Sequence, residues 1–418
     1  MRLKDVEILH VAPPPPGWGG RYWTLVKVTA DNGIHGWGEC YVSTVGPRAM
    51  TAVIEDVFDR HMRGASPEDI ELMFRRVYSS GFTQRPDPTV IGAFSGLEIA
   101  CWDILGKARC RPVWALLGGL MNARIRSYTY LYPQPGQDHA EFWVNADWQA
   151  EAAAAAVAAG FTAVKFDPAG PYTIRGGHQP AMSDITRSVA FCARIRDAVG
   201  DRADLLFGTH GQFTTAGAIR LGQALEPYAP LWYEEPIPPD MLPEFAEVAR
   251  AVRIPLATGE RMATKAEFGT LLRLGGVKIL QPALGRVGGI WEAKKIAAMA
   301  EAFNAEMAPH LYAGPVEWAA NIHLAASIPN LLIAETIETG GAFHLALIRH
   351  AIRWEDGYVI PPETPGLGIE VDEALARAHP YTGDRLHLEM QEAPCDYRHG
   401  NRFAGGAPAP AALPDEAL

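Results

Sequence analysis

Positive charge, cysteine and long apolar runs are all scarce in this sequence. Its 37 lysine and arginine residues are outnumbered by 48 aspartate and glutamate residues, so the net charge is −11, which argues against a nucleic-acid partner. The five cysteines are scattered without CxxC spacing, which indicates neither a disulfide framework nor a zinc cluster and favours a reducing cytoplasm. Nowhere do about 18 apolar residues run together, and residues 1–12 contain no apolar signal core, so we expect neither a membrane span nor a targeting segment.

Length and apolar content are plentiful. The 418 residues are 48% apolar, which is enough for one very large domain or for two domains of unequal size. The first part has three strand-like runs, Val6–Val11, Thr24–Val28 and Gly33–Glu39, and then apolar residues at helical spacing from Met50 to Lys107. This order predicts an α+β unit at the N-terminus.

The pattern of apolar residues changes between Ile125 and Glu335, where short apolar β-type runs alternate with amphipathic helical segments. Eight such units predict an α/β fold, a closed parallel (β/α)₈ barrel with its site at the carboxyl ends of the strands. A doubly wound open sheet is the alternative, but it normally needs a glycine-rich phosphate turn after its first strand, which residues 132–136 do not supply. The eight runs are TYLY, AVKF, DLLF, LWY, PLAT, VKIL, EMA and LLIA.

Charged side chains stand where these strands end. Glu234 in LWYEEP and Glu260 in PLATGER lie one βα unit apart, so neighbouring strands would direct both carboxylates into the barrel mouth. The pair predicts a hard-cation site, unless one carboxylate caps a helix or pairs with an arginine such as Arg261. Buried charges are costly unless they bind something, so a ring of them predicts a functional site. The other members of the ring are Lys165, His210, His310 and Glu335.

A set of motifs in a fixed order carries a resemblance that covers nearly the whole chain. The motifs are GWGE, SGLEIACWDILGKARCRPVWALLGG, the lysine of AVKFDP, WYEEP, ATGER, the Gly288–Gly289 pair, APH and the final IAE. With them the sequence resembles the enolase superfamily, in the mandelate racemase and muconate lactonizing enzyme-like branch that acts on acid sugars.

The resemblance also implies how the chain is divided. It predicts an α+β capping domain over residues 1–123, a barrel over residues 124–360 and a C-terminal segment, 361–403, that returns to the cap. Two cap loops, Pro13–Tyr22 and Cys40–Pro47, are expected to close over the site. Composition predicts a disordered tail over residues 404–418.

In such proteins, acids at the strand ends bind Mg²⁺, and a base removes the proton α to a substrate carboxylate. By resemblance, Glu234 and Glu260 are ligands for Mg²⁺, with Mn²⁺ or another divalent metal as alternatives. Lys165 is the predicted base, because a neighbouring divalent cation would lower its pKa. Glu335, if protonated, would donate to or orient the other carboxylate oxygen.

Two positions depart from the family pattern. Gly208 stands where the family has a third acidic ligand, and Ala283 stands where it has the aspartate that pairs with the histidine of the seventh strand. Without that carboxylate, His310 is expected to be a weaker base than Lys165.

Three candidates remain for the third ligand. His210 lies two residues beyond Gly208, and Asp167 lies two residues beyond Lys165, each on the same strand face as its predecessor. Water is the third candidate, since Mg²⁺ commonly keeps several. In acid-sugar dehydratases, however, a histidine at the position of His210 more often protonates the leaving hydroxyl.

The predicted function is metal-dependent α-proton abstraction from an aldonic or aldaric acid, followed by β-elimination of water with help from His210 or His310. A cycloisomerase or epimerase shares the first step and is the nearest alternative. Gly208 and Ala283 motivate another, a catalytically degenerate barrel that only binds a sugar acid. The expected partner is a small carboxylate, and we expect a homo-oligomer. Candidates for substrate contact are Trp18, Arg21, Tyr22, Asp167 and Tyr312.

Overall fold

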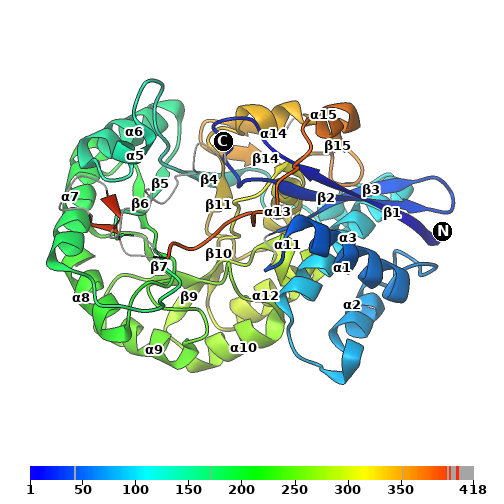
Figure 1. Ribbon diagram of the computed structural model, residues 1–418, viewed down its shortest axis with the longest axis horizontal. Helices are drawn as coiled ribbons and strands as arrows, with labels where there is room; N and C mark the ends of the chain where they lie inside the picture. The colour runs from blue at the N-terminus through cyan, green and yellow to red at the C-terminus, as the bar shows by residue number, and fades with distance from the viewer. Residues whose placement is uncertain (42–43, 171, 351, 393–394, 397–401, 404–418) are drawn as a thin grey trace.

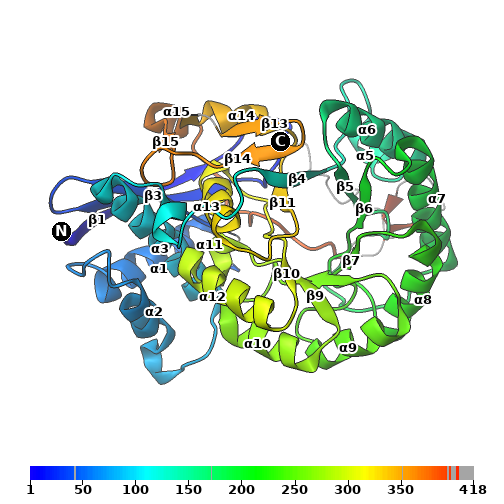
Figure 2. The ribbon, with the colours of Figure 1, turned by 180° about the vertical axis from the view of Figure 1, so that it is seen from behind.

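The computed structural model describes residues 1–41, 44–170, 172–350, 352–392, 395–396 and 402–403. Two parts lie side by side in Figure 1, a smaller N-terminal unit in blue and cyan and a ring of strands and helices in green and yellow. The view from behind in Figure 2 shows the same arrangement, with helices α6 to α10 around the outside of the ring.

The N-terminal unit is an antiparallel sheet of three strands, β1 (Leu3–Val11), β2 (Trp23–Ala30) and β3 (His35–Cys40). The three predicted strands are therefore confirmed. Helix α3 (Pro88–Arg109) lies directly on β3, because a Cβ atom on Gly38 would lie only 1.8 Å from the carbonyl oxygen of Gly96. The other helices here are α1 (Pro47–His61), α2 (Ile70–Tyr78), η1 (Ser80–Phe82) and α4 (Val113–Leu116).

The ring is a closed parallel barrel. Strands β10 to β4 neighbour one another in sequence order, and β11 pairs with β4 on the other side. A parallel bridge between Met307 and Leu331 joins β10 to the segment that leads into β11. The predicted (β/α)₈ barrel is confirmed, and the open-sheet alternative is wrong. Its strands are β4 (Ile125–Tyr130), β5 (Ala163–Phe166), β6 (Asp204–Phe207), β7 (Trp232–Glu234), β8 (Leu256–Thr258), β9 (Val277–Leu280), β10 (Glu306–Met307) and β11 (Ala334–Thr336).

A helical segment follows every barrel strand, as the alternating pattern predicted. The helices are α5 (His139–Phe142), α6 (Ala146–Ala159), α7 (Met182–Val199), α8 (Thr215–Leu225), η2 (Glu226–Tyr228), α9 (Leu242–Ala251), α10 (Thr264–Leu274), α11 (Leu284–Val287), α12 (Gly289–Ala302), α13 (Pro315–Ser327) and α14 (Ala342–Ala346).

The side chains inside the barrel form two layers, and the lower one, toward the amino ends of the strands, is buried and apolar. Because strand side chains alternate, the position two residues further along each strand points into the same interior, closer to the carboxyl end. That upper layer contains Lys165, Glu234 and His310, so the fold itself brings them to one place. The lower layer consists of Tyr128, Ala163, Leu206, Trp232, Ala257, Ile279, Ala308 and Ile333.

Two buried glutamates of the cap fasten it to the barrel. Glu98 on α3 accepts hydrogen bonds from the backbone N–H groups of Ile290 (2.8 Å) and Trp291 (2.9 Å) at the start of α12. Glu39 on β3 accepts from the N–H groups of Gly314 (2.6 Å) and Glu317 (3.0 Å) at the start of α13. Each carboxylate satisfies orphan donors at the positive end of a helix.

The C-terminal part contacts both units. Strand β14 (Tyr358–Ile360) adds antiparallel to β4, and the N–H of Tyr381 donates to the carbonyl of His10 in the cap. Beyond α15 (Glu373–Ala378), the segment reaches the barrel, where Gln391 forms a bridge with Thr173. The predicted domain bounds stay a prediction, and residues 404–418 lie outside the described residues. The remaining strands are β12 (Ile348–Arg349), β13 (Arg353–Glu355), β15 (Glu370–Val371), β16 (Cys395–Asp396) and β17 (Arg402–Phe403).

Among the residues that the structure describes, one helix is long and apolar enough to cross a membrane. This helix is α3, and 83% of its apolar stretch is buried inside the protein. Helix α3 packs against β3, α1, α2 and α11, so α3 is the core helix of the cap.

Candidate active site

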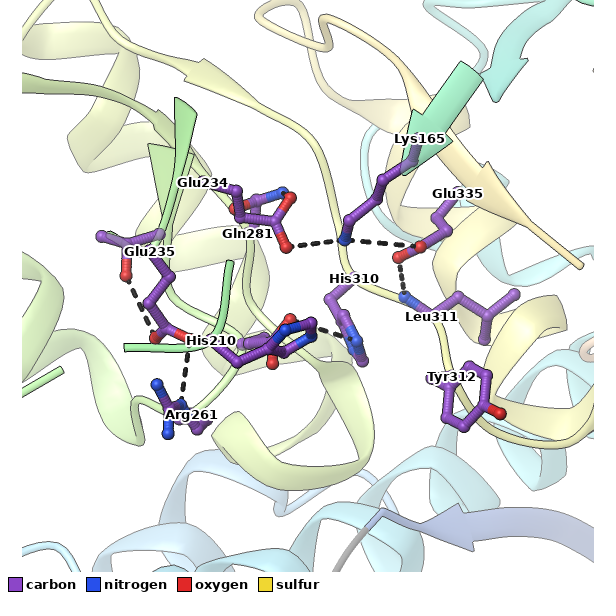
Figure 3. A network of polar contacts seen from close by, with 12 residues as sticks. Lys165, His210, Glu234, Glu235, Arg261, Gln281, His310, Leu311, Tyr312 and Glu335 are labelled. Carbon is purple, nitrogen blue, oxygen red and sulfur yellow. Dashed lines mark hydrogen bonds and ion pairs between the residues drawn. The ribbon is translucent and has the colours of Figure 1, made fainter. Parts of the chain in front are cut away.

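An ion pair lies at the centre of the barrel mouth. The Nζ atom of Lys165, at the end of β5, lies 2.6 Å from Oε1 of Glu234, at the end of β7. The same Nζ atom lies 3.7 Å from Oε1 of Glu335 on β11, so the ammonium group stands between two carboxylates (Figure 3). Lys165 is 1% exposed, and both glutamates are buried.

The second oxygens of both glutamates are also engaged. Oε2 of Glu234 accepts a hydrogen bond of 2.8 Å from the side-chain amide of Gln281, just beyond β9. Oε2 of Glu335 accepts one of 2.7 Å from the backbone N–H of Leu311. Sequence reasoning missed Gln281, although its place directly after the VKIL strand was the available signal.

The charge of Lys165 follows from these neighbours. Burial alone would lower the pKa of its ammonium group, but the carboxylates of Glu234 and Glu335 raise that pKa well above its usual value. Burial raises the pKa of both glutamates, and the ammonium group counteracts part of that rise. The lowered lysine pKa expected beside a divalent cation stays a prediction, because the raised pKa here belongs to the ammonium group paired with the two carboxylates alone.

A second pair joins His310 to Glu260. Nε2 of His310 lies 3.3 Å from Oε2 of Glu260. His310 therefore contacts a carboxylate, and this carboxylate belongs to Glu260 instead of to an aspartate at position 283. Burial lowers the pKa of His310 to about 4, more than the Glu260 charge raises it, which leaves the ring neutral at pH 7. The ring of Tyr41, from the Cys40–Pro47 loop, lies 5.2 Å from that of His310. Sequence reasoning missed Tyr41; residues 42–43 of the same loop lie outside the described residues.

His210 and Asp167 form a third pair. Nδ1 of His210 lies 2.8 Å from Oδ2 of Asp167, and the ring of Tyr172 lies 4.3 Å from the imidazole. Burial would lower the pKa of His210, but the hydrogen bond and charge of Asp167 raise it above its usual value. His210 is therefore the more basic of the two histidines at the barrel mouth.

Arg261 pairs with neither Glu234 nor Glu260. Its Nε atom lies 2.9 Å from Oε2 of Glu235, and the hydroxyl of Thr258 donates to the other oxygen of Glu235 at 3.3 Å. Glu235 has a positive φ of 39°, a rare conformation that turns its side chain toward Arg261. The alternative that Arg261 neutralises one of the two predicted ligands is therefore wrong.

The donor set does not fit the Mg²⁺ ion that the family implies. Among the described residues, no group of three or more histidine, cysteine, aspartate or glutamate side chains is arranged to hold a metal. A Cβ atom on Gly208 would lie 3.0 Å from the Tyr130 hydroxyl and 3.4 Å from Cε of Lys165, so a side chain at the position of the third ligand would press on Tyr130 and lie against Lys165. Of the three substitutes predicted for it, the two side chains, His210 and Asp167, contact each other through Nδ1 and Oδ2, while Oδ1 of Asp167 is buried without a hydrogen-bond partner.

The predicted substrate contacts divide into two groups. Trp18 packs on Tyr132, with ring centroids 4.4 Å apart, and forms an apolar wall together with Ile337 just beyond β11. Tyr22 instead stacks on Tyr381 at 4.4 Å, and Arg21 lies 3.5 Å from Glu389.

Residues 381–389 of the C-terminal segment thus hold part of the Pro13–Tyr22 loop. The same segment reaches Tyr312, whose carbonyl oxygen lies 3.3 Å from Nε2 of His387. Tyr312 is partly buried next to Leu311 and lies beside the Lys165 network in Figure 3. The structure therefore brings Trp18 and Tyr312 to the barrel mouth and directs Arg21 and Tyr22 toward the C-terminal segment.

Comparison with known proteins gives one consistent family. Residues 20–118 match the mandelate racemase / muconate lactonizing enzyme N-terminal domain, and residues 147–375 match the enolase C-terminal domain-like family. The chain is 34% identical to D-galactonate dehydratase of Ralstonia pickettii (strain 12J), over 84% of this chain and 90% of that protein.

Solved structures agree with the family models. A mandelate racemase/muconate lactonizing enzyme-like protein from Roseovarius sp. TM1035 is 74% identical with a TM-score of 0.93, covering 95% of this chain and 100% of that one. A mandelate racemase/muconate lactonizing enzyme from Jannaschia sp. CCS1 is 66% identical with a TM-score of 0.91, covering 93% of this chain and 100% of that one.

Proposed function

Because the chain belongs to the mandelate racemase / muconate lactonizing enzyme family of the enolase superfamily, we propose that it is a hydro-lyase that removes water from a sugar acid. The similarity to D-galactonate dehydratases supports the substrate class. An aldonic or aldaric acid carries both groups that the reaction needs, a proton α to a carboxylate and a hydroxyl on the β carbon.

The observation that carries the proposal is the pair of histidines in opposite states at one barrel mouth. His310 is buried and neutral, with a pKa of about 4, so its ring is free to accept a proton. His210 has a raised pKa because of Asp167, so its ring is available to donate one. Dehydration needs both an acceptor for the α-proton and a donor for the leaving hydroxyl.

The proposed reaction uses these groups in order. His310 takes the α-proton, and the electrons of the C–H bond form an enediolate of the substrate carboxylate. The C–O bond of the β-hydroxyl then breaks as His210 gives its proton to the departing oxygen, which leaves as water. The resulting enol tautomerises to a 2-keto-3-deoxy acid, so the step needs no oxidant or reductant.

Lys165 takes a different role from the predicted one. An ammonium group held between Glu234 and Glu335 has no free electron pair with which to remove a proton. We place it against the substrate carboxylate, where its charge stabilises the enediolate as it forms. Glu335, whose pKa burial raises, is placed to share a proton with the second carboxylate oxygen.

The test is incubation with D-galactonate and a panel of other aldonic and aldaric acids in D₂O, followed by NMR. Wild type is expected to yield a 2-keto-3-deoxy acid. Removal of a general base or acid costs ~10²–10⁴ in rate, so His310→Asn should lose α-proton exchange and dehydration together. His210→Asn should lose dehydration while it keeps α-proton exchange.

His61→Asn, near the end of α1 in the cap, is the matched control and should behave as wild type. Exchange without any dehydration by wild type would instead indicate an epimerase or cycloisomerase. No exchange with any acid sugar would contradict the proposal and favour a protein that only binds its ligand.

We also propose that the enzyme acts in the cytoplasm as a homo-oligomer on a small carboxylate. The four cysteines whose side chains the structure describes are free thiols, which suits a reducing compartment. Size-exclusion chromatography with light scattering would test the oligomeric state.

A further inference from the structure

The barrel mouth already contains a cation of its own. Three carboxylates, those of Glu234, Glu260 and Glu335, gather there and are buried. In a solvent-poor site such a surplus of negative charge needs a positive counter-charge. The Lys165 ammonium supplies one, at 2.6 Å from Glu234 and 3.7 Å from Glu335.

The space for a third acidic ligand is narrow as well. A side chain at position 208 would have to begin 3.0 Å from the Tyr130 hydroxyl and 3.4 Å from Cε of Lys165. The ammonium nitrogen lies 4.9 Å from the centre of the Tyr130 ring, a cation–π contact that supports the lysine in this place. Gly208, Tyr130 and Lys165 therefore form one complementary arrangement.

The two predicted metal ligands each contact another side chain. Glu234 uses one oxygen for Lys165 and the other for the Gln281 amide, at 2.8 Å. Glu260 lies 3.3 Å from Nε2 of His310. A divalent ion would have to displace a buried ammonium group and compete with these contacts to reach the carboxylates of Glu234 and Glu260.

We propose that the Lys165 ammonium group replaces the divalent metal ion of related enzymes, so that this protein binds no Mg²⁺ at its barrel mouth and works without it. The inference rests on the proposed function for its catalytic part, and its metal-binding part stands independently. An ammonium group presents a single charge and three N–H donors, which suit a carboxylate that is becoming an enediolate.

The decisive experiment measures metal directly. The full-length protein, treated with EDTA and passed over chelating resin, is titrated with MgCl₂ and with MnCl₂ by isothermal calorimetry, and its metal content is determined by mass spectrometry. We expect no stoichiometric binding of either ion. Dehydration or α-proton exchange should proceed at the same rate with EDTA as with added Mg²⁺.

A lysine variant tests whether Lys165 is what excludes the metal. Lys165→Met removes the charge and keeps an apolar side chain of similar length, so Glu234 loses the ammonium group at its Oε1 atom and affinity for Mg²⁺ should rise until binding is measurable. Activity without metal should fall by ~10²–10³, the usual cost of losing one donor to a developing oxyanion. Lys278→Met, an exposed lysine on β9, is the matched control, and circular dichroism checks that both variants are folded.

The outcomes separate the two proposals. Stoichiometric Mg²⁺ binding by wild type, or activity lost in EDTA and restored by Mg²⁺, overturns the replacement of the metal but leaves the hydro-lyase intact. Absence of Mg²⁺ binding by folded Lys165→Met overturns the claim that Lys165 takes the metal's place. Absence of exchange and dehydration under every metal condition overturns the proposed function, while calorimetry still decides the metal question.

Discussion

Buried glutamates occur in two regions of this protein, and their partners differ. At the junction of cap and barrel, Glu39 and Glu98 accept hydrogen bonds from backbone N–H groups at the starts of α13 and α12. At the barrel mouth, Glu234 and Glu260 contact the side chains of Lys165 and His310. Backbone donors can neither titrate nor move away, whereas lysine and histidine side chains can do both.

The acidic residues in the motifs of this family therefore fall into two kinds, those that join the cap to the barrel and those that line the barrel mouth. GWGE and SGLEIACWD contain Glu39 and Glu98, which hold the two parts of the molecule in register. WYEEP and ATGER contain Glu234 and Glu260, which hold groups that meet the substrate in the proposed reaction. The same substitution, glutamate to glutamine, should therefore damage stability in one region and activity in the other.

The largest effect is expected from Glu98→Gln. The amide would turn an N–H donor toward Ile290, Trp291 or the Trp102 indole, all of which donate to Glu98 now. An unsatisfied buried donor costs about 1–3 kcal/mol, so the melting temperature should fall clearly. Differential scanning calorimetry measures this, with Glu363→Gln on the surface as control; an unchanged melting temperature would refute the fastening role.

Gly289→Ala tests the same junction from the barrel side. A Cβ atom at Gly289 would lie 2.0 Å from Oε2 of Glu98, and the residue has a φ of +86° that favours glycine. We expect destabilisation by about 1–3 kcal/mol. In the Glu98→Gln background, Gly289→Ala should cost less free energy of unfolding, because the contact between positions 98 and 289 is already disturbed. If the two losses of stability simply add, the two positions act independently.

At the barrel mouth, Glu234→Gln should lower kcat/KM while the melting temperature stays near that of wild type. The neutral amide no longer holds the Lys165 ammonium, and without that carboxylate the pKa of Lys165 should fall toward its ordinary value. A loss of about tenfold or more corresponds to about 1.4 kcal/mol. Steady-state kinetics and calorimetry on the same preparation measure both quantities, and a stability loss equal to that of Glu98→Gln would erase the distinction between the regions.

A further effect, which both junction glutamates share, is expected from pH. Burial raises the pKa of Glu39 and of Glu98 to about 7, above the value of about 4.5 for the unfolded chain, although backbone hydrogen bonds counteract part of the rise. A folded state with the higher pKa binds more protons, so this contribution to stability is complete below about pH 4.5 and is lost as the pH rises through 7. The melting temperature of wild type should therefore decline between about pH 4.5 and pH 7.

Glu39→Gln should flatten that decline, because an amide does not titrate in this range. Melting curves at constant ionic strength across the interval provide the measurement. A slope identical to that of wild type would mean that other groups cause the pH dependence.

The sequence by itself determined the architecture. Eight β-then-α units are a local pattern, and parallel strands of a barrel place their carboxyl ends together, so Lys165, Glu234 and His310 had to meet at one mouth. The vacancy at Gly208 and the missing aspartate at Ala283 were likewise visible in the chain alone.

Only the tertiary structure decided which of these groups pair. Lys165 lies against Glu234 two strands away, Asp167 against His210, and Glu260 rather than a residue at 283 against His310. The sequence also did not indicate that Gln281 contacts Glu234, or that residues 381–389 contact Arg21 and Tyr22. Such contacts depend on strand stagger and side-chain reach of a few ångströms across the barrel, and no local pattern of residues encodes those distances.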